Sequence, residues 1–202
     1  MKTRLGINEF LVGIDNECIK NVYAEQALSN WCWAASTQMV LKSHCIDLSQ
    51  HQLVEILTKG NLCYPNCPNN FFSVANLLNN ATTNCYKIIA QAYQGLPNAD
   101  YLISEIENEN PVIIGLWENQ SDIGHAVVLT NLIYKIGFNG LNYISKLFVL
   151  DPFPSIENKN QNGIKVYEGG YISTVINTFL IIKTQIIRSE EHTSELQSRQ
   201  VI

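Results

Sequence analysis

A cysteine and a glutamine early in the chain have the types and spacing that nucleophilic chemistry needs. Cys32 lies in Asn-Trp-Cys-Trp-Ala-Ala-Ser, which predicts the first turn of a helix, and a helix N-terminus favours the thiolate form of a cysteine. The thiolate is the form that attacks a carbonyl carbon. Gln26 stands six residues earlier. Its side-chain amide and the Cys32 backbone N–H could both donate hydrogen bonds to a developing oxyanion.

A histidine and an aspartate later in the chain could complete such a site. Residues 125–136 and 141–150 are rich in β-forming residues and are separated by Gly-Phe-Asn-Gly, which predicts a hairpin. Folding the chain about this turn places His125 opposite position 152, with an error of a residue or two if a bulge intervenes. Asp151 is then its neighbour across the strands. A carboxylate there could orient the imidazole and stabilise its charged form.

Each of these features also has an ordinary structural explanation. The cysteine segment alone is typical of a buried helix with an inert thiol, Gly-His-Ala-Val-Val-Leu of the beginning of a strand, and Asp-Pro of a turn. Catalysis is favoured because Gln26, Cys32, His125 and Asp151 occur together, in this order and at these offsets.

The elements that must position these residues change in type along the chain. Helical signals dominate the first part, and they predict helices over 27–43 with Ser29 or Asn30 as N-cap, after Ser49 with Gln52 completing a capping box, over 70–78 and over 98–107.

Strand signals dominate after Pro111. Helices first and strands second predict an α+β fold with an antiparallel sheet. We expect one domain over residues 1–187, with its helical part at about 20–110 and its sheet part at about 111–187. The expected strands are 112–117, 125–136, 141–150, 164–168 and 178–187.

The same residues resemble a known family. Gln26-x5-Cys32-Trp-Ala-Ala, Gly-His125-Ala-Val-Val-Leu and Asp151-Pro are similar to the papain-like cysteine proteases, in particular to the compact bacterial branch that includes bacteriocin leader peptidases and a plant-pathogen effector protease. The resemblance covers Gln26 to Asp151 and implies a papain-like fold. It implies Cys32 as nucleophile, His125 as general base, Asp151 as orienting residue and Gln26 as oxyanion donor.

The sequence departs from the family pattern at two places. Asn30 stands where the papain-type pattern has a glycine two residues before the cysteine. The third catalytic residue of the family is often an asparagine, which makes Asn131 a second candidate for the role given to Asp151.

We therefore expect a cysteine peptidase that hydrolyses peptide bonds through a thioacyl-enzyme, with no metal and no organic cofactor. The expected partner is a protein or peptide substrate, and the expected state is a monomer. Two alternatives remain open: another acyl-transfer enzyme of the transglutaminase or deamidase type, and a non-catalytic binding module on a papain-like scaffold.

Composition excludes several other classes of protein. The chain has 202 residues, of which 46% are apolar and 15% charged, and this composition excludes a disordered protein. A net charge of −5 argues against nucleic-acid binding. No stretch approaches the roughly 20 apolar residues of a membrane span. We recognise no signal peptide, because Asn8, Glu9 and Asp15 interrupt the apolar residues near the N-terminus.

The remaining cysteines are Cys18, Cys45, Cys63, Cys67 and Cys85. Cys63 and Cys67, with Cys45 and Cys85 on either side, could form two disulfides in an oxidising compartment, and we favour this over free thiols and over a four-cysteine zinc site. A secreted or effector-like location is accordingly favoured over the cytoplasm.

Residues 188–202 have a different character from the rest. The segment begins Arg-Ser-Glu-Glu-His-Thr-Ser-Glu-Leu-Gln-Ser, which looks like the translation of a sequencing adapter. Its composition also differs, because Arg4 is the one arginine before residue 188 and the last 15 residues contain two. We expect this segment to be an artefact tail and exclude it from the fold.

Overall fold

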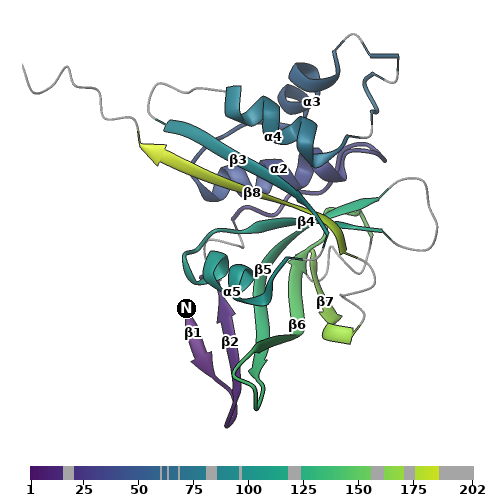
Figure 1. The fold of residues 1–202 in the computed structure, drawn as a ribbon. Helices are drawn as coiled ribbons and strands as arrows, with labels where there is room; N and C mark the ends of the chain where they lie inside the picture. The colour runs from purple at the N-terminus through teal and green to yellow at the C-terminus, as the bar shows by residue number, and fades with distance from the viewer. Residues whose placement is uncertain are drawn as a thin grey trace, which may run out of the picture.

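The computed structural model describes residues 1–15, 21–59, 61–62, 64–67, 69–80, 86–95, 97–117, 124–155, 162–170 and 176–186. The tail predicted to be an adapter lies outside these residues. Figure 1 shows the arrangement of the helices and strands.

Four helices agree with the predicted ones to within a few residues. Local sequence explains two of their starts. The Ser49 hydroxyl accepts a hydrogen bond from the Gln52 N–H while the Gln52 side chain accepts one from the Ser49 N–H, which is the predicted capping box. Asn98 caps the last helix by accepting from Asp100 N. The helices are α2 (Cys32–Ser43), α3 (Gln50–Thr58), α4 (Phe71–Asn80) and α5 (Ala99–Glu107).

The predicted cap of α2 is wrong. The N-cap residue is Trp31, and no side chain caps this helix end within the described residues. Ser29 and Asn30 are engaged elsewhere, because Asn66 Nδ2 donates to Ser29 Oγ at 2.9 Å and Asn30 Nδ2 donates to Asn66 O at 3.0 Å. The two polar side chains hold a neighbouring loop instead of the helix end.

The strands form one eight-stranded sheet in which every described pair is antiparallel. This agrees with the predicted α+β class, although the analysis of the sequence did not predict β1, β2 or β3. The strands are β1 (Lys2–Arg4), β2 (Glu9–Gly13), β3 (Tyr86–Gln94), β4 (Val112–Leu116), β5 (His125–Ile136), β6 (Asn142–Leu150), β7 (Ile164–Glu168) and β8 (Ile176–Ile186).

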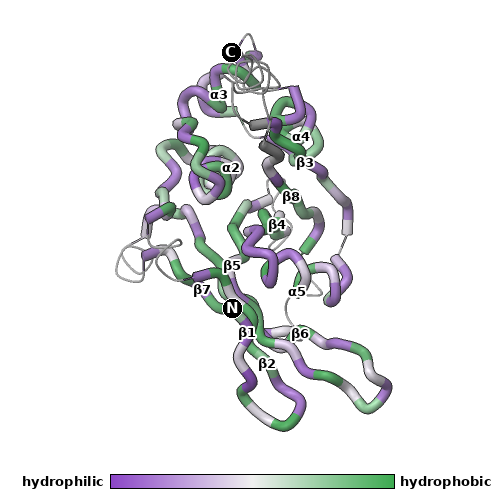
Figure 2. Tube along the Cα trace, turned by 90° about the vertical axis from the view of Figure 1, so that its left-hand side faces the viewer, coloured by the Kyte–Doolittle hydropathy of each residue, from purple (hydrophilic) through white to green (hydrophobic). Residues whose placement is uncertain are grey.

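Strand β5 is the centre of the sheet. One edge of β5 pairs with β4 over its first half and with β2 over its second half, and the other edge pairs with β6. β4 continues to β8 and β3, and β6 continues to β7. Figure 2 shows that β4 and β5 are hydrophobic along most of their length, as expected for strands buried on both faces.

Helices α2, α3 and α4 gather at one end of the molecule, and the turns that follow β1 and β5 extend from the other end (Figure 1). α2 packs against β4 and β5 and places Met39, Val40 and Leu41 in the core with no exposed surface. Full burial of such side chains stabilises the fold by about 1.5–3 kcal/mol each. α2 is therefore held rigidly against the strand that begins with His125.

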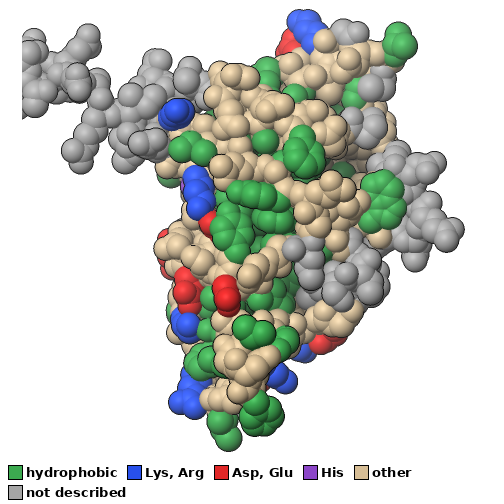
Figure 3. All heavy atoms as spheres, viewed as in Figure 1, with side chains coloured by type: hydrophobic (Ala, Val, Ile, Leu, Met, Phe, Trp, Pro, Cys, Tyr) green, Lys and Arg blue, Asp and Glu red, His purple; other side chains and the backbone are tan. Residues whose placement is uncertain are grey.

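The surface has two plain features. Figure 3 shows charged side chains scattered over the face in view and apolar ones at its lower end. Ile7 in the β1–β2 turn and Phe138 in the β5–β6 turn are both exposed. Of the helices that the structure describes, none combines the length and the apolar character needed to cross a membrane.

Candidate active site

Cys32 is the first residue of α2 and is 8% exposed. One turn further along the same helix, the Ser36 hydroxyl donates a buried hydrogen bond to the Ala126 carbonyl at 3.1 Å. Ala126 directly follows His125 on β5, so this bond fixes the start of the helix relative to the start of the strand. A sulfur at a helix N-terminus and an imidazole at a strand end are thereby brought to one place.

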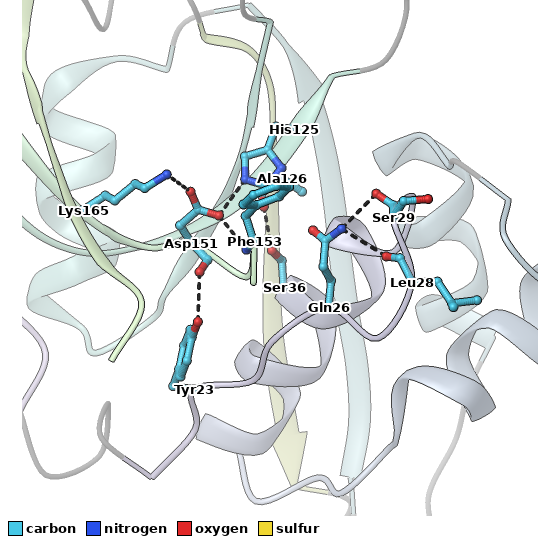
Figure 4. A network of polar contacts seen from close by, with 10 residues as sticks. All are labelled: Tyr23, Gln26, Leu28, Ser29, Ser36, His125, Ala126, Asp151, Phe153 and Lys165. Carbon is cyan, nitrogen blue, oxygen red and sulfur yellow. Dashed lines mark hydrogen bonds and ion pairs between the residues drawn. The ribbon is translucent and has the colours of Figure 1, made fainter. Parts of the chain in front are cut away.

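His125 lies between a thiol and a carboxylate. Its Nε2 is 2.7 Å from Asp151 Oδ1, and the Cys32 side chain lies near enough to raise the pKa of the imidazole. Figure 4 shows the imidazole directed at the Asp151 carboxylate. Because Nε2 faces the carboxylate, Nδ1 is the ring nitrogen left for the thiol.

The hairpin register predicted from the sequence is displaced by one residue. Val128 pairs with Leu150 at the end of the ladder, which extrapolates to position 153 opposite His125 rather than 152. The displacement is already present beside the turn, where Ile136 pairs with Asn142, and the two later irregularities in the ladder cancel each other. Asp151 lies just beyond the last pair, so its side chain still reaches the imidazole.

The Asp151 carboxylate is 1% exposed and fully engaged. Oδ1 also accepts from Phe153 N at 2.8 Å, and Oδ2 accepts from Lys165 Nζ at 2.5 Å. Both oxygens therefore have cationic or N–H donors, which satisfies the requirement for burying a charge. Figure 4 shows the carboxylate between His125 and Lys165.

The backbone of Asp151 is held as firmly as its side chain. Its N–H donates to Gly163 O at 2.7 Å, which adds one bond beyond the β6–β7 ladder. Its carbonyl accepts from the Tyr23 hydroxyl at 3.3 Å. The aspartate is thus attached to three segments that are distant in sequence.

Charge pairing shifts the pKa of both members of the His–Asp pair. Burial lowers the pKa of His125, but the hydrogen bonds and negative charges of Asp151 and Cys32 outweigh burial and raise it to about 9. Burial raises the pKa of Asp151, but its hydrogen bond and charge interaction with His125, aided by Lys165 and Phe153, lower it to about 2. An imidazolium beside a carboxylate is therefore the favoured state near neutral pH.

The backbone of Gln26 is clamped beside this pair. Gln26 N donates to Pro152 O at 2.8 Å, which ties it to the residue after Asp151. The buried Gln50 side chain holds the flanking residues, because its Nε2 donates to Glu25 O at 2.8 Å and its Oε1 accepts from Ala27 N at 3.0 Å. Gln26 is therefore brought to the site, as the sequence predicted.

The Gln26 side chain is oriented differently from the prediction. Its Nε2 donates to Leu28 O at 3.0 Å and to Ser29 O at 2.8 Å, as Figure 4 shows, so both amide hydrogens are used. Two carbonyl acceptors exclude the flipped amide, since its oxygen would then face two oxygens. Gln26 Oε1 is buried and has no hydrogen-bond partner among the described residues.

A loop braces the turn that carries Cys32. Trp31 Nε1 donates to Pro65 O at 2.9 Å, and Trp33 Nε1 donates to Cys67 O at 3.2 Å. Both indoles are buried, so these bonds satisfy their N–H groups. The tryptophans on either side of the cysteine thus serve to fix the loop.

Cys67 in this loop is disulfide-bonded, in agreement with the expected oxidised cluster. Cys45 is free and exposed, so the predicted pair of disulfides that included Cys45 is wrong. The tight turn after α2, where Cys45 itself has a positive φ of 61°, leaves this side chain in solvent. Cys18, Cys63 and Cys85 lie outside the described residues.

A cavity of about 420 Å³ opens beside Cys32 and His125. Among the described residues, Cys32 and His125 are the ionisable side chains of the lining, which otherwise combines aromatic rings with amide and hydroxyl groups. The lining residues are Asn30, Cys32, Trp33, Asn69, Asn70, Phe71, Phe72, Gly115, Leu116, Trp117, Gly124, His125, Ala126, Asn177 and Thr178.

The structure does not bring Asn131, the second candidate for the third residue, to the site. It lies six residues along β5 from His125, about 20 Å at the usual rise per residue. Its side chain instead covers Gly13 on β2.

Lys165 and the cavity are features that the sequence analysis missed. Lys165 lies in Ile-Lys-Val-Tyr-Glu, an alternating strand in which Lys165 and Tyr167 are the partly buried positions. A lysine at an inward-facing position is the signal that could have indicated a buried acidic partner. Within the described residues, no three His, Cys, Asp or Glu side chains are grouped to hold a metal ion.

An α+β protein with a thiol beside an imidazole–carboxylate pair has the arrangement that cysteine-dependent hydrolases use. The profile of the Peptidase_C39 like family matches residues 19–176, and the chain belongs to this family. The matched region includes Cys32, His125 and Asp151. Family membership supports a cysteine peptidase, and hence a protein substrate. A search of curated proteins found no match to the chain.

Proposed function

We propose that this protein is a papain-like cysteine peptidase that cleaves peptide bonds through a thioacyl-enzyme on Cys32. The observation that carries the proposal is the 2.7 Å contact between His125 Nε2 and Asp151 Oδ1, together with the cavity that His125 and Cys32 line. This order supplies a nucleophile, a proton carrier and a group that fixes the carrier.

In the proposed reaction, transfer of the Cys32 proton to His125 gives a thiolate beside an imidazolium, and the sulfur attacks the carbonyl carbon of the scissile peptide bond. The tetrahedral intermediate collapses as His125 protonates the leaving amine, which departs and leaves a thioester. Water then attacks the thioester with His125 as base, the carboxylic acid product leaves, and the thiol regains its proton. Asp151 keeps the imidazole in one orientation throughout.

The proposed oxyanion donors are the Cys32 N–H and the Gln26 amide. The Cys32 N–H belongs to the first turn of α2, whose N–H groups have no acceptor within the helix. Gln26 can contribute only if substrate binding releases one of its bonds to Leu28 O or Ser29 O. The Gln26 backbone is held by its bond to Pro152 O, so rotation of the side chain alone would free the amide for the oxyanion.

The described lining of the cavity supports a peptide substrate with an uncharged side chain at the position bound next to the scissile bond. Its aromatic and amide groups offer apolar contact and neutral hydrogen bonds, and, apart from Cys32 and His125, none of the described lining residues has a charged side chain. The disulfide at Cys67 supports a working location in an oxidising compartment.

The test compares the two free cysteines of the described chain under a limiting amount of a thiol-directed electrophile. Cys45 is the internal control, because it is exposed and forms no hydrogen bond with an imidazole of the described residues, whereas Cys32 is 8% exposed. We expect Cys32 to be alkylated faster than Cys45, and His125→Ala to abolish the difference. Faster labelling of Cys45 in the wild-type protein would contradict the proposal.

Peptide libraries then identify the reaction. We expect cleavage of peptides with large neutral side chains, lost in Cys32→Ala, and weaker cleavage when that side chain is charged. Ammonia release from glutamine without peptide cleavage would instead indicate a deamidase or transglutaminase. A reactive Cys32 with neither reaction would indicate the non-catalytic alternative.

A further inference from the structure

The feature that the proposed mechanism does not use is Lys165, the cation on the far side of the Asp151 carboxylate. Lys165 Nζ is 2.5 Å from Asp151 Oδ2, while Oδ1 of the same group serves His125. One buried negative charge is therefore placed between two cations. The aspartate side chain is 1% exposed and the lysine side chain 37% exposed.

The position of Lys165 follows from the sheet. Lys165 pairs with Val149 across the β6–β7 ladder, two residues before Asp151 on the neighbouring strand. One residue beyond the ladder, Asp151 N donates to Gly163 O. β7 and the glycine before it thus present a side-chain cation and a backbone acceptor to the same residue.

We propose that Lys165 is a positioning residue of this site: its ammonium group holds the Asp151 carboxylate in place and offsets part of the negative charge that otherwise acts on His125 alone. The proposal rests on the proposed function, because it assigns Lys165 to the Cys–His–Asp set. Among the described residues, Asp151 is the ion-pair partner of Lys165, so Lys165 acts through Asp151.

Two physical consequences follow. Anchoring of Oδ2 stops the carboxylate from rotating away from the imidazole. The positive charge of Lys165 also weakens the preference for an imidazolium, because like charges disfavour each other. Removal of the ammonium group therefore raises the pKa of His125, whereas removal of the carboxylate lowers it.

The titratable groups around the carboxylate come from several segments of the fold. His125 and Lys165 contact it directly, and Tyr23 contacts the Asp151 carbonyl. Two further groups influence these neighbours and not the carboxylate itself: Cys32 affects the pKa of His125, and Glu25 affects the pKa of Tyr23.

An ordinary structural role for Lys165 predicts a different result. An inward-pointing charge on an edge strand protects a sheet against pairing with other chains, and such a role predicts a change in stability or aggregation alone. Lys146 provides a matched control, because it forms an ion pair with Glu168 at 3.0 Å across the same two strands and does not contact Asp151.

The experiment is an NMR titration of the His125 imidazole in the full chain, which requires no knowledge of the substrate. We expect Lys165→Met to raise the pKa of His125 by about 0.5–1 unit. This shift is smaller than the one that a charge in direct contact with the imidazole causes, because Lys165 is partly exposed and the Asp151 carboxylate lies between it and His125. Lys165→Arg keeps the charge and should restore the wild-type value, and Lys146→Met should leave it unchanged. If Lys165→Met does not fold, Lys165→Gln replaces it.

An unchanged or lowered pKa in a folded Lys165→Met or Lys165→Gln protein overturns the proposal, as does an equal shift in Lys146→Met. These outcomes do not affect the peptidase proposal, because that proposal is tested separately by Cys32 labelling and peptide cleavage. Once a substrate is known, the basic limb of kcat/KM should move to higher pH in Lys165→Met.

Discussion

Replacement of Asp151 by asparagine removes one charge and almost no volume. The wild-type carboxylate accepts from His125 and Phe153 on Oδ1 and from Lys165 on Oδ2. An asparagine oxygen can still accept from the imidazole. Its NH2 group then faces the Lys165 ammonium, so two donors oppose each other.

The magnitude follows from the shifted pKa of the imidazole. Asp151 and Cys32 together raise the pKa of His125 from an ordinary 6.5 to about 9, against the opposing effect of burial. Without the carboxylate charge we expect it to fall by about 1–2 units, because the Cys32 contribution remains. The basic limb of the kcat/KM profile should move from near 9 to about 7–8.

The rate at the pH optimum should also fall. We expect a loss of about 10²-fold in kcat, within the usual range for general acid–base catalysis, because the imidazole is less well oriented. Asp151→Ala should lose more, since alanine offers no acceptor. In the double variant Asp151→Asn/Lys165→Met the donor that opposes the amide is gone, so part of the loss should be recovered.

The assay combines the pH dependence of peptide cleavage with the NMR titration of His125 in the same variants. The reasoning is refuted if Asp151→Asn leaves both the basic limb and the maximal rate unchanged. A double variant that is worse than the sum of the two single ones would show that Lys165 does not oppose the amide.

Four further results are expected. Cys32→Ala should abolish turnover and keep the thermal unfolding curve nearly unchanged, because alanine suits a helix; substantial residual turnover would contradict the role of Cys32. Gln26→Ala should lower kcat by about 10²–10³ with little change in KM, and a rise in KM alone would make Gln26 a binding residue. The pKa of Asp151 is lowered to about 2 in the folded protein, so its contribution of roughly 2 kcal/mol is present above about pH 4 and is lost as pH falls towards 2. Denaturant unfolding should show this loss in the wild type and not in Asp151→Asn. Deletion of residues 188–202 should change the free energy of unfolding by no more than about 0.5 kcal/mol, and a clear loss of stability would show that the segment belongs to the fold.

Local sequence determined the helices and most of the strands. The capping box of Ser49 and Gln52 needs only four consecutive residues, and the structure contains it where it was predicted. The neighbourhood of His125 and Asp151 was also predictable, because a single hairpin joins their strands and register within a hairpin is set by its own turn. The one-residue error came from the turn, because Ile136 pairs with Asn142 and the turn is therefore centred on Asn139.

Sequence patterns failed where a local signal was overruled by distant contacts. Ser29 and Asn30 are good capping residues, but both side chains form hydrogen bonds with Asn66 and therefore do not cap α2. The Gln26 backbone is bonded to the residue after Asp151, yet the orientation of its side-chain amide is decided by which carbonyls lie within reach after the turn folds. Neither result follows from residue type or spacing.

The second cation at Asp151 was decided by tertiary structure alone. The order of residue types along the chain determined which groups could be nucleophile, base and orienting acid, because these roles depend on side-chain chemistry and on segments that fold locally. Lys165 reaches the carboxylate only because β7 pairs with β6 at one register, and the cavity exists only because α4, β4 and β8 meet beside Cys32. Such contacts join residues that are far apart in the chain, and their geometry is set by the packing of the whole core, which no short sequence window contains.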